Sequence, residues 1–100
     1  MRTMLKLSIP VEAGNRTVKD GSLQRLVGSV MEQLHSEAAY FFTENGRRTA
    51  LMVFDMKDAT QIPSIVEPFF IGLDAEVTPT PVMNADDLKA GLEAAAKKRG

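Results

Sequence analysis

The chain has 100 residues, of which 44% are hydrophobic, so it is long enough for one globular domain and too apolar for a disordered chain. It contains no cysteine, which excludes disulfides, thiolate nucleophiles and cysteine-based metal centres and favours a reducing compartment. The formal net charge of −1 gives no general attraction to nucleic acid or to anionic lipid.

The first predicted element is a strand over residues 4–11, in which apolar and polar side chains alternate. Its inward side chains would be Leu5, Leu7 and Ile9. Pro10 favours the end of the strand or an edge position. Residues 12–21 hold two glycines and several charges, and they predict a long loop.

An amphipathic helix is predicted from Ser22 onward, because the apolar residues repeat there at helical spacing. The apolar stripe consists of Leu23, Leu26, Val27, Val30, Met31 and Leu34. Asp20 or Ser22 can cap the free N–H groups of the first turn. Leu26 and Val30 lie in the middle of the stripe, so we expect both side chains in the core.

Two strands are predicted next, over residues 38–43 and 48–56, and they are joined through Asn45-Gly46. Asn-Gly is the strongest short hairpin signal, since both residues tolerate the positive φ angles of a type I′ turn. A two-residue turn also sets the register of the hairpin. On one face it pairs Tyr40 with Leu51, Phe42 with Thr49 and Ala38 with Val53.

A second amphipathic helix is predicted over the apolar residues of 62–73, and two signals compete for its start. Asp58 and Gln61 have the spacing of a capping box, whereas Pro63 is typical of a first helical turn. Pro68 should kink or shorten this helix, because it lacks the N–H that the helical ladder needs.

The last two elements are an edge strand and a terminal helix. Residues 75–83 read as an extended segment, and its two prolines confine it to a sheet edge or a bulge. Asn84 then caps a helix that runs through Lys98, and the basic residues near its end suit the negative end of the helix dipole.

The element order is βαββαβ followed by one helix, which predicts an α+β, ferredoxin-like fold with a four-stranded antiparallel sheet in a single domain over residues 1–100. The two crossover helices of this topology cover one face of the sheet. The hairpin is apolar on both faces, so the other face would expose several large side chains. A homodimer that stacks two sheets removes this exposure. The alternative is that the last helix folds back across the open face.

The order of elements, the opening segment MLKLSIPVEAGNR and the closing segment VTPTPVMNADDL resemble a family of small bacterial proteins of unassigned function. Proteins of that family are grouped with the dimeric α/β-barrel folds, so the resemblance implies a homodimer of that type. The wider group includes cofactor-free monooxygenases, lactone isomerases, haem-degrading enzymes and proteins without known activity. Fold does not choose among these functions.

Candidate site residues are few. His35, the only histidine, could act as a general base, but it falls at the end of the first helix, where a histidine commonly interacts with the helix terminus. Tyr40, Thr49 and Asp55 share one face of the hairpin, and Lys6 or Ser8 from the first strand can join them. If that face lines a cleft at a dimer centre, these are polar groups in an otherwise apolar pocket, which suits a small, mostly apolar ligand.

Other classes of ligand are not supported by the sequence. Acidic pairs lie where helices begin, which capping explains, and no metal or cofactor site is predicted. RNA recognition motifs share this topology, yet Thr49 and Leu51 stand where their stacking aromatics belong and Arg48 stands where their glycine belongs. No apolar run approaches the ~18 residues of a membrane span. We therefore expect a cytoplasmic protein with no nucleic-acid or membrane partner.

Two functional hypotheses follow. The first is a homodimer without a demonstrable catalytic motif that binds a small apolar ligand between its sheets. The alternative is a cofactor-independent, monooxygenase- or isomerase-like enzyme acting on a small aromatic or lactone substrate, with Tyr40, Asp55 and His35 as its polar participants. The sequence leaves the choice between them open.

Overall fold

The computed structural model describes residues 1–100, which form four strands, four α-helices and one short 3-10 helix. The strands are β1 (Arg2–Ile9), β2 (Ala38–Glu44), β3 (Arg47–Asp55) and β4 (Glu76–Pro81). The helices are α1 (Val11–Asp20), α2 (Ser22–Leu34), α3 (Ile62–Leu73) and α4 (Ala85–Arg99), and η1 (Ala59–Gln61) immediately precedes α3.

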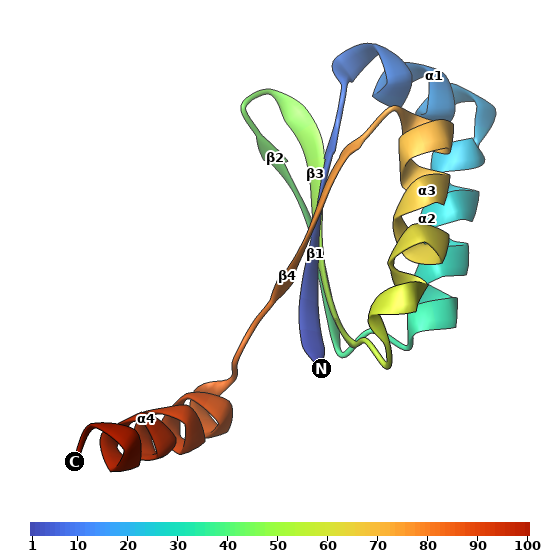
Figure 1. Ribbon diagram of the computed structural model, residues 1–100. Helices are drawn as coiled ribbons and strands as arrows, with labels where there is room; N and C mark the ends of the chain where they lie inside the picture. The colour runs from blue at the N-terminus through green and yellow to red at the C-terminus, as the bar shows by residue number, and fades with distance from the viewer.

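The four strands form one antiparallel sheet in the order β2-β3-β1-β4. Helices α1, α2 and α3 all lie on one face of this sheet, and the opposite face carries no helix (Figure 1). The architecture is therefore α+β and of the ferredoxin-like type, with an additional C-terminal helix, as the sequence predicts.

The β2–β3 hairpin has the predicted turn and the predicted register. Asn45 and Gly46 have φ angles of 54° and 75°, which both belong to a type I′ turn. The cross-strand partners on the open face are Ala38 with Val53, Tyr40 with Leu51, and Phe42 with Thr49. The two-residue turn was thus sufficient to place every side chain of the hairpin on its correct face.

The core lies between the sheet and the three helices that cover it. Leu5, Leu7 and Ile9 of β1 point into it, and Met52 and Phe54 of β3 lie beside them, as the strand alternation requires. From α3, the fully buried side chain of Phe69 fills the centre of this layer. Burial of these large apolar groups is the main source of stability for the fold.

The prediction of a loop over residues 12–21 is wrong, because α1 occupies Val11–Asp20. The side of α1 that faces the protein is made of Ala13, Gly14 and Thr17, so no stripe of large apolar residues revealed it. Small residues serve here because α1 approaches the sheet closely. A Cβ atom on Gly14 would lie 2.7 Å from Nη1 of Arg48.

Helix α2 begins directly after α1, and Gly21 makes the turn between them with a left-handed φ of 81°. The Asp20 carboxylate accepts hydrogen bonds from both the backbone N–H and the hydroxyl of Ser22. Val30 is buried, as expected, whereas Leu26 is half-buried and packs at the margin of the core.

Both signals at the start of the second predicted helix are used. Asp58 and Gln61 form a capping box around η1, and Pro63 lies in the first turn of α3. Helix α3 then continues past Pro68 to Leu73, so this proline does not end it. A helix can accommodate an internal proline where packing against the sheet holds the flanking turns in place.

Helix α4 projects away from the rest of the molecule (Figure 1). Asn84 caps its first turn, as predicted, and forms a capping box with Asp87, but none of the residues of α4 is buried. The radius of gyration is 16.1 Å, compared with about 13 Å for a compact chain of this length. The alternative in which the last helix folds back over the open face of its own sheet is therefore wrong.

Candidate functional site

The open face of the sheet is divided into an apolar half and a polar half. On the middle of β2 and β3 its side chains are Ala38, Tyr40, Phe42, Leu51 and Val53 together with the buried Thr49, and the polar Glu44, Arg47 and Asp55 lie on the same face at the strand ends. On β1 and β4 they are Met4, Lys6, Ser8, Glu76, Thr78 and Thr80. Tyr40 is 66% exposed although it lies in the middle of a strand. The boundary between the halves runs along the centre of the sheet, between β3 and β1.

The polar half contains a hollow of about 200 Å³ near the hairpin turn. Its lining residues are all polar: Lys6, Ser8, Glu44, Asn45, Glu76 and Thr78. The Lys6 Nζ donates to Oε1 of Glu44 at 2.5 Å, which spans the sheet from β1 to the edge strand β2. The hollow therefore offers charged and hydroxyl groups.

The structure brings some of the predicted site residues together. Strand pairing places Tyr40, Leu51 and Lys6 in one row across the sheet. Thr49 lies in the adjacent row, where its side chain is buried and its hydroxyl donates to the backbone oxygen of Arg47 at 3.1 Å. Tyr40 and Lys6 are thus the two predicted residues whose side chains lie in one row of this face, Tyr40 exposed and Lys6 paired with Glu44, while Thr49 lies in the next row.

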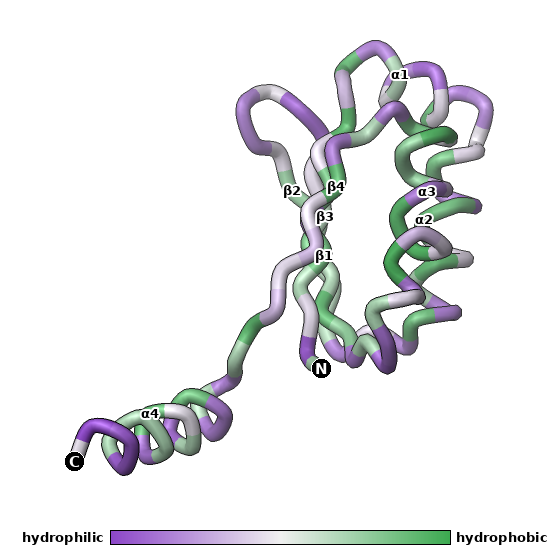
Figure 2. The backbone as a smooth tube through the Cα atoms, in the orientation of Figure 1, coloured by the Kyte–Doolittle hydropathy of each residue, from purple (hydrophilic) through white to green (hydrophobic).

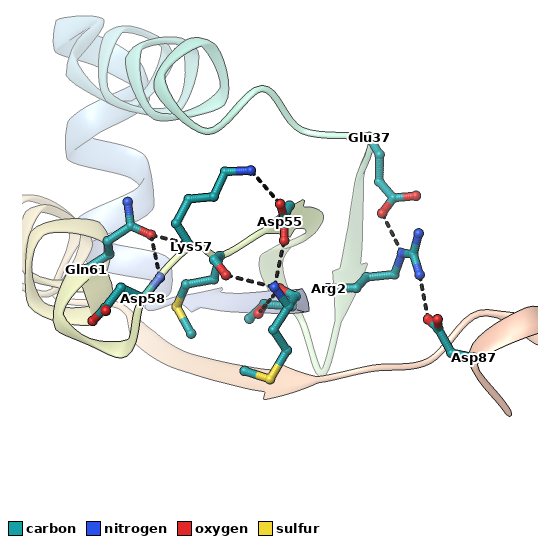
Figure 3. Close-up of polar contacts among 10 residues, drawn as sticks. Arg2, Glu37, Asp55, Lys57, Asp58, Gln61 and Asp87 are labelled. Carbon is teal, nitrogen blue, oxygen red and sulfur yellow. Dashed lines mark hydrogen bonds and ion pairs between the residues drawn. The ribbon is translucent and has the colours of Figure 1, made fainter. Parts of the chain in front are cut away.

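Asp55 shares this face but lies at the far end of β3, about 13 Å along the strand from Leu51. Its carboxylate accepts hydrogen bonds from Nζ of Lys57 and from the N-terminal amine of Met1, each at 2.6 Å (Figure 3). These two cations, Lys57 first, lower the pKa of Asp55 to about 2. A carboxylate with so low a pKa is a weak general base near neutral pH.

His35 lies outside the sheet altogether. It forms the C-terminal cap of α2 in the left-handed conformation, with a φ of 50°. This is the helix-end position that the sequence indicated, and it separates the imidazole from Tyr40 and Lys6.

No three histidine, aspartate or glutamate side chains lie close enough together to hold a metal ion.

Arg2 makes two structural contacts that the sequence did not reveal. Its Nε donates to Glu37 at 2.7 Å and its Nη1 donates to Asp87 at 2.6 Å, so one guanidinium joins β1 to the residue before β2 and to the first turn of α4 (Figure 3). Both carboxylates raise the pKa of Arg2. The partners are 35 and 85 residues away in sequence, so no local pattern could have indicated the contact.

A second hollow lies on the helix-covered side of the sheet, where no local sequence pattern indicated one. Its volume is about 400 Å³, twice that of the polar hollow. The lining is mostly apolar and comes from β1, β2, β3 and α2: Ile9, Leu23, Val27, Phe41, Phe42, Thr43, Arg48, Thr49 and Ala50. Residues of four elements meet there only in the folded chain.

No protein-family model matches this chain, and no curated protein matches it significantly. Its helices include none with the length and apolar character needed to cross a membrane.

Proposed function

We propose that the chain functions as a cytoplasmic homodimer in which the open faces of two sheets stack and hold a small, mostly apolar ligand between them. One observation carries this proposal: the apolar half of the open face has no covering element within the chain. Tyr40, Phe42 and Leu51 lie next to one another on that half. At about 25 cal/mol per Å², covering such side chains contributes several kcal/mol to association.

A second copy also accounts for the size of the polar hollow. Alone, this hollow measures about 200 Å³, which is smaller than the roughly 300–1,000 Å³ of typical small-molecule sites. A stacked second sheet would close it from above and add its own side chains. The ligand's apolar body would then contact Tyr40 and Leu51, while a polar group would reach Lys6 or Thr78.

Helix α4 supports the same proposal from another part of the chain. Leu88 and Leu92 lie one turn apart on one face of α4, and they are 46% and 61% exposed. Figure 2 shows hydrophobic positions along α4 with no other element beside them. In a dimer, the helix of one copy is free to pack on its partner, and the Arg2 contact with Asp87 sets where it leaves the sheet.

The alternative of a cofactor-independent enzyme receives less support. Of its three proposed polar participants, Asp55 and His35 lie away from Tyr40, and Asp55 is held by two cations. Tyr40 and Lys6 lie in one row across the sheet, with Leu51 between them. This pair can bind and orient a ligand, so we propose binding rather than catalysis.

The test of the dimer uses charge substitutions on exposed apolar side chains. Light scattering of the wild-type chain at micromolar concentration should give twice the monomer mass of 10.9 kDa. Tyr40→Lys should give the monomer mass with unchanged helix content, because a desolvated charge opposes stacking. Ile71→Lys is the matched control, since Ile71 is 79% exposed on the outer side of α3 and should leave the dimer intact. A monomer mass for the wild type refutes the proposal.

The test of the ligand uses a smaller change at the same position. Tyr40→Phe removes one hydroxyl and retains the apolar ring, so dimer mass should be unchanged. A thermal-shift screen of small aromatic acids and lactones should find ligands that raise the melting temperature of the wild type and stabilise Tyr40→Phe less. Equal stabilisation of both proteins would show that the Tyr40 hydroxyl does not contact the ligand.

A further inference from the structure

The apolar hollow on the helix-covered side exists because the helices do not extend over the edge strand. Helix α2 contacts β3 and helix α3 contacts β4, while β2 lies at the edge beyond β3. On the helix side of β2, Ala39 still packs against the core, whereas Phe41 has no helix above it and is 58% exposed. The space between β2 and α2 is the hollow.

The walls of this hollow are suited to an apolar group. Leu23 and Val27 of α2 form one wall, Ile9 and Ala50 of the sheet lie at its base, and Phe41 stands at its rim. Its volume of about 400 Å³ falls within the usual range for small-molecule sites, without any contribution from a second chain.

Arg48 is the only charged residue in the lining. Its Nη1 donates to Oδ1 of Asn15 at 3.1 Å, and none of the ion pairs of the structure includes it. A guanidinium carries five N–H donors, so most of those of Arg48 remain free for another partner. A cation without a carboxylate at the wall of an apolar hollow is complementary to an anion.

Gly14 leaves room for this guanidinium beside α1. A Cβ atom at position 14 would be 2.7 Å from Nη1 and 3.4 Å from Cδ of Arg48, so a larger residue would push the arginine side chain away from this position. The contact with Asn15 on the same helix then orients the planar group. Arg48 is thereby held between α1 and the hollow.

We propose that this hollow binds a small monocarboxylic acid with an aromatic or aliphatic body, whose carboxylate pairs with Arg48 and whose body contacts Leu23, Val27 and Phe41. A planar guanidinium and a carboxylate can form two parallel hydrogen bonds, which select a carboxylate over a neutral polar group. The hollow lies on the helix-covered side, although Phe42 and Thr49 of its lining have the parity of the open face. The groups proposed to bind the acid, Arg48, Leu23, Val27 and Phe41, require neither a second chain nor a ligand between the sheets.

The wild-type chain allows a first test through matched ligands. The probes are 4-phenylbutanoate, 4-phenylbutanol and 4-phenylbutylamine, which share one apolar body and differ in charge. We expect the acid to bind at least about tenfold more tightly than the alcohol by calorimetry, and the amine to bind most weakly. In amide NMR spectra the acid should shift Leu23, Val27, Phe41 and Ala50. Shifts centred on Tyr40 and Lys6, or no saturable binding by the acid, would overturn the proposal.

Substitutions at two adjacent arginines supply the second test. Arg48→Met removes the charge but keeps an unbranched apolar stem, and it should weaken the acid about tenfold or more while leaving the alcohol unchanged. Arg48→Lys should retain part of the preference for the acid. Arg47→Met is the matched control, since Arg47 points to the opposite face and pairs there with Glu76 at 3.8 Å. Equal acid binding by Arg48→Met and the wild type would refute the role of Arg48. Dispersed NMR spectra and light scattering on the same samples separate this result from misfolding or a change in oligomeric state.

Discussion

Helices α2 and α4 are similar in length, but packing against the sheet stabilises α2 and local interactions stabilise α4. Helix α2 spans 13 residues without a side-chain cap, and it contains Gly28 and the β-branched Val27 and Val30, which disfavour an isolated helix. Its formation depends on burying Val27 and Val30 against the sheet. Most helices of globular proteins owe their stability to such packing.

Helix α4 spans 15 residues and buries none of them. Its local signals are strong, with a capping box at Asn84, acidic residues in the first turn, basic residues in the last turn and a run of alanines between them. Each of these favours a helix without any tertiary contact. An amphipathic pattern alone therefore does not reveal whether a helix belongs to the core of its own chain.

The largest effect that separates the two helices should come from truncating one leucine in each. Leu26→Ala in α2 should lower the free energy of unfolding by about 2 kcal/mol, the lower end for buried leucines, because Leu26 is half-buried. Leu88→Ala in α4 should change it by less than about 0.5 kcal/mol in dilute samples that dissociate any dimer. Urea denaturation followed by circular dichroism measures both values. Similar losses for the two variants would mean that α4 packs on its own chain.

A smaller effect should follow from removing the cap of α4. Asn84→Ala should destabilise the helix by about 1 kcal/mol, because the side chain accepts a hydrogen bond from the N–H of Asp87 at 2.8 Å. Circular dichroism at 222 nm should show a loss of helical signal on the order of one or two helical turns, while the unfolding midpoint of the sheet and helices α1 to α3 should not change. A lower midpoint for the whole chain would show that the helix and the body unfold as one unit.

The smallest effect should come from the exposed charges at the end of β3. The folded state holds the pKa of Asp55 at about 2, below its ordinary value of 3.8, so its pairs with Lys57 and the N-terminus stabilise the fold above about pH 4. That contribution is lost as the pH falls through about 2. Asp55→Asn should therefore be less stable than the wild type near neutral pH, and the difference should vanish in acid.

Urea titrations at several pH values check this prediction. The difference between wild type and Asp55→Asn at neutral pH should be smaller than the change caused by Leu26→Ala, because solvent screens exposed charges. A difference that persists unchanged near pH 2 would show that Asp55 acts through something other than its charge.

Part of the candidate site could be predicted from the sequence. The register of the β2–β3 hairpin placed Tyr40 beside Leu51 and on the same face as Thr49, because a two-residue turn leaves no freedom in strand pairing. Lys6 of β1 lies in the same row. The alternation of apolar and polar residues in β1 indicated which face of the sheet its side chain occupies. Asp55 lies on the predicted face of β3 but too far along the strand from Leu51 to join this row. Two residues that share a face of a strand can still be several residues apart.

The apolar hollow and the position of α4 could not be predicted. The hollow requires β2 to extend beyond the helices, and Arg48 to lie against Gly14, a residue that local patterns had placed in a loop. Pattern recognition depends on large apolar residues at regular spacing, and α1 uses small ones because it lies close to the sheet.

The sequence by itself determined the strands, the hairpin turn, the capped helices and the ferredoxin-like order, because each depends on residues close together in the chain. Only the tertiary structure decided that α1 is a helix, that α4 leaves the open face uncovered and that Arg48 faces an apolar hollow. These features depend on contacts between distant segments, such as that of Arg2 with Asp87. Such contacts form only when close packing of the whole chain brings their partners together.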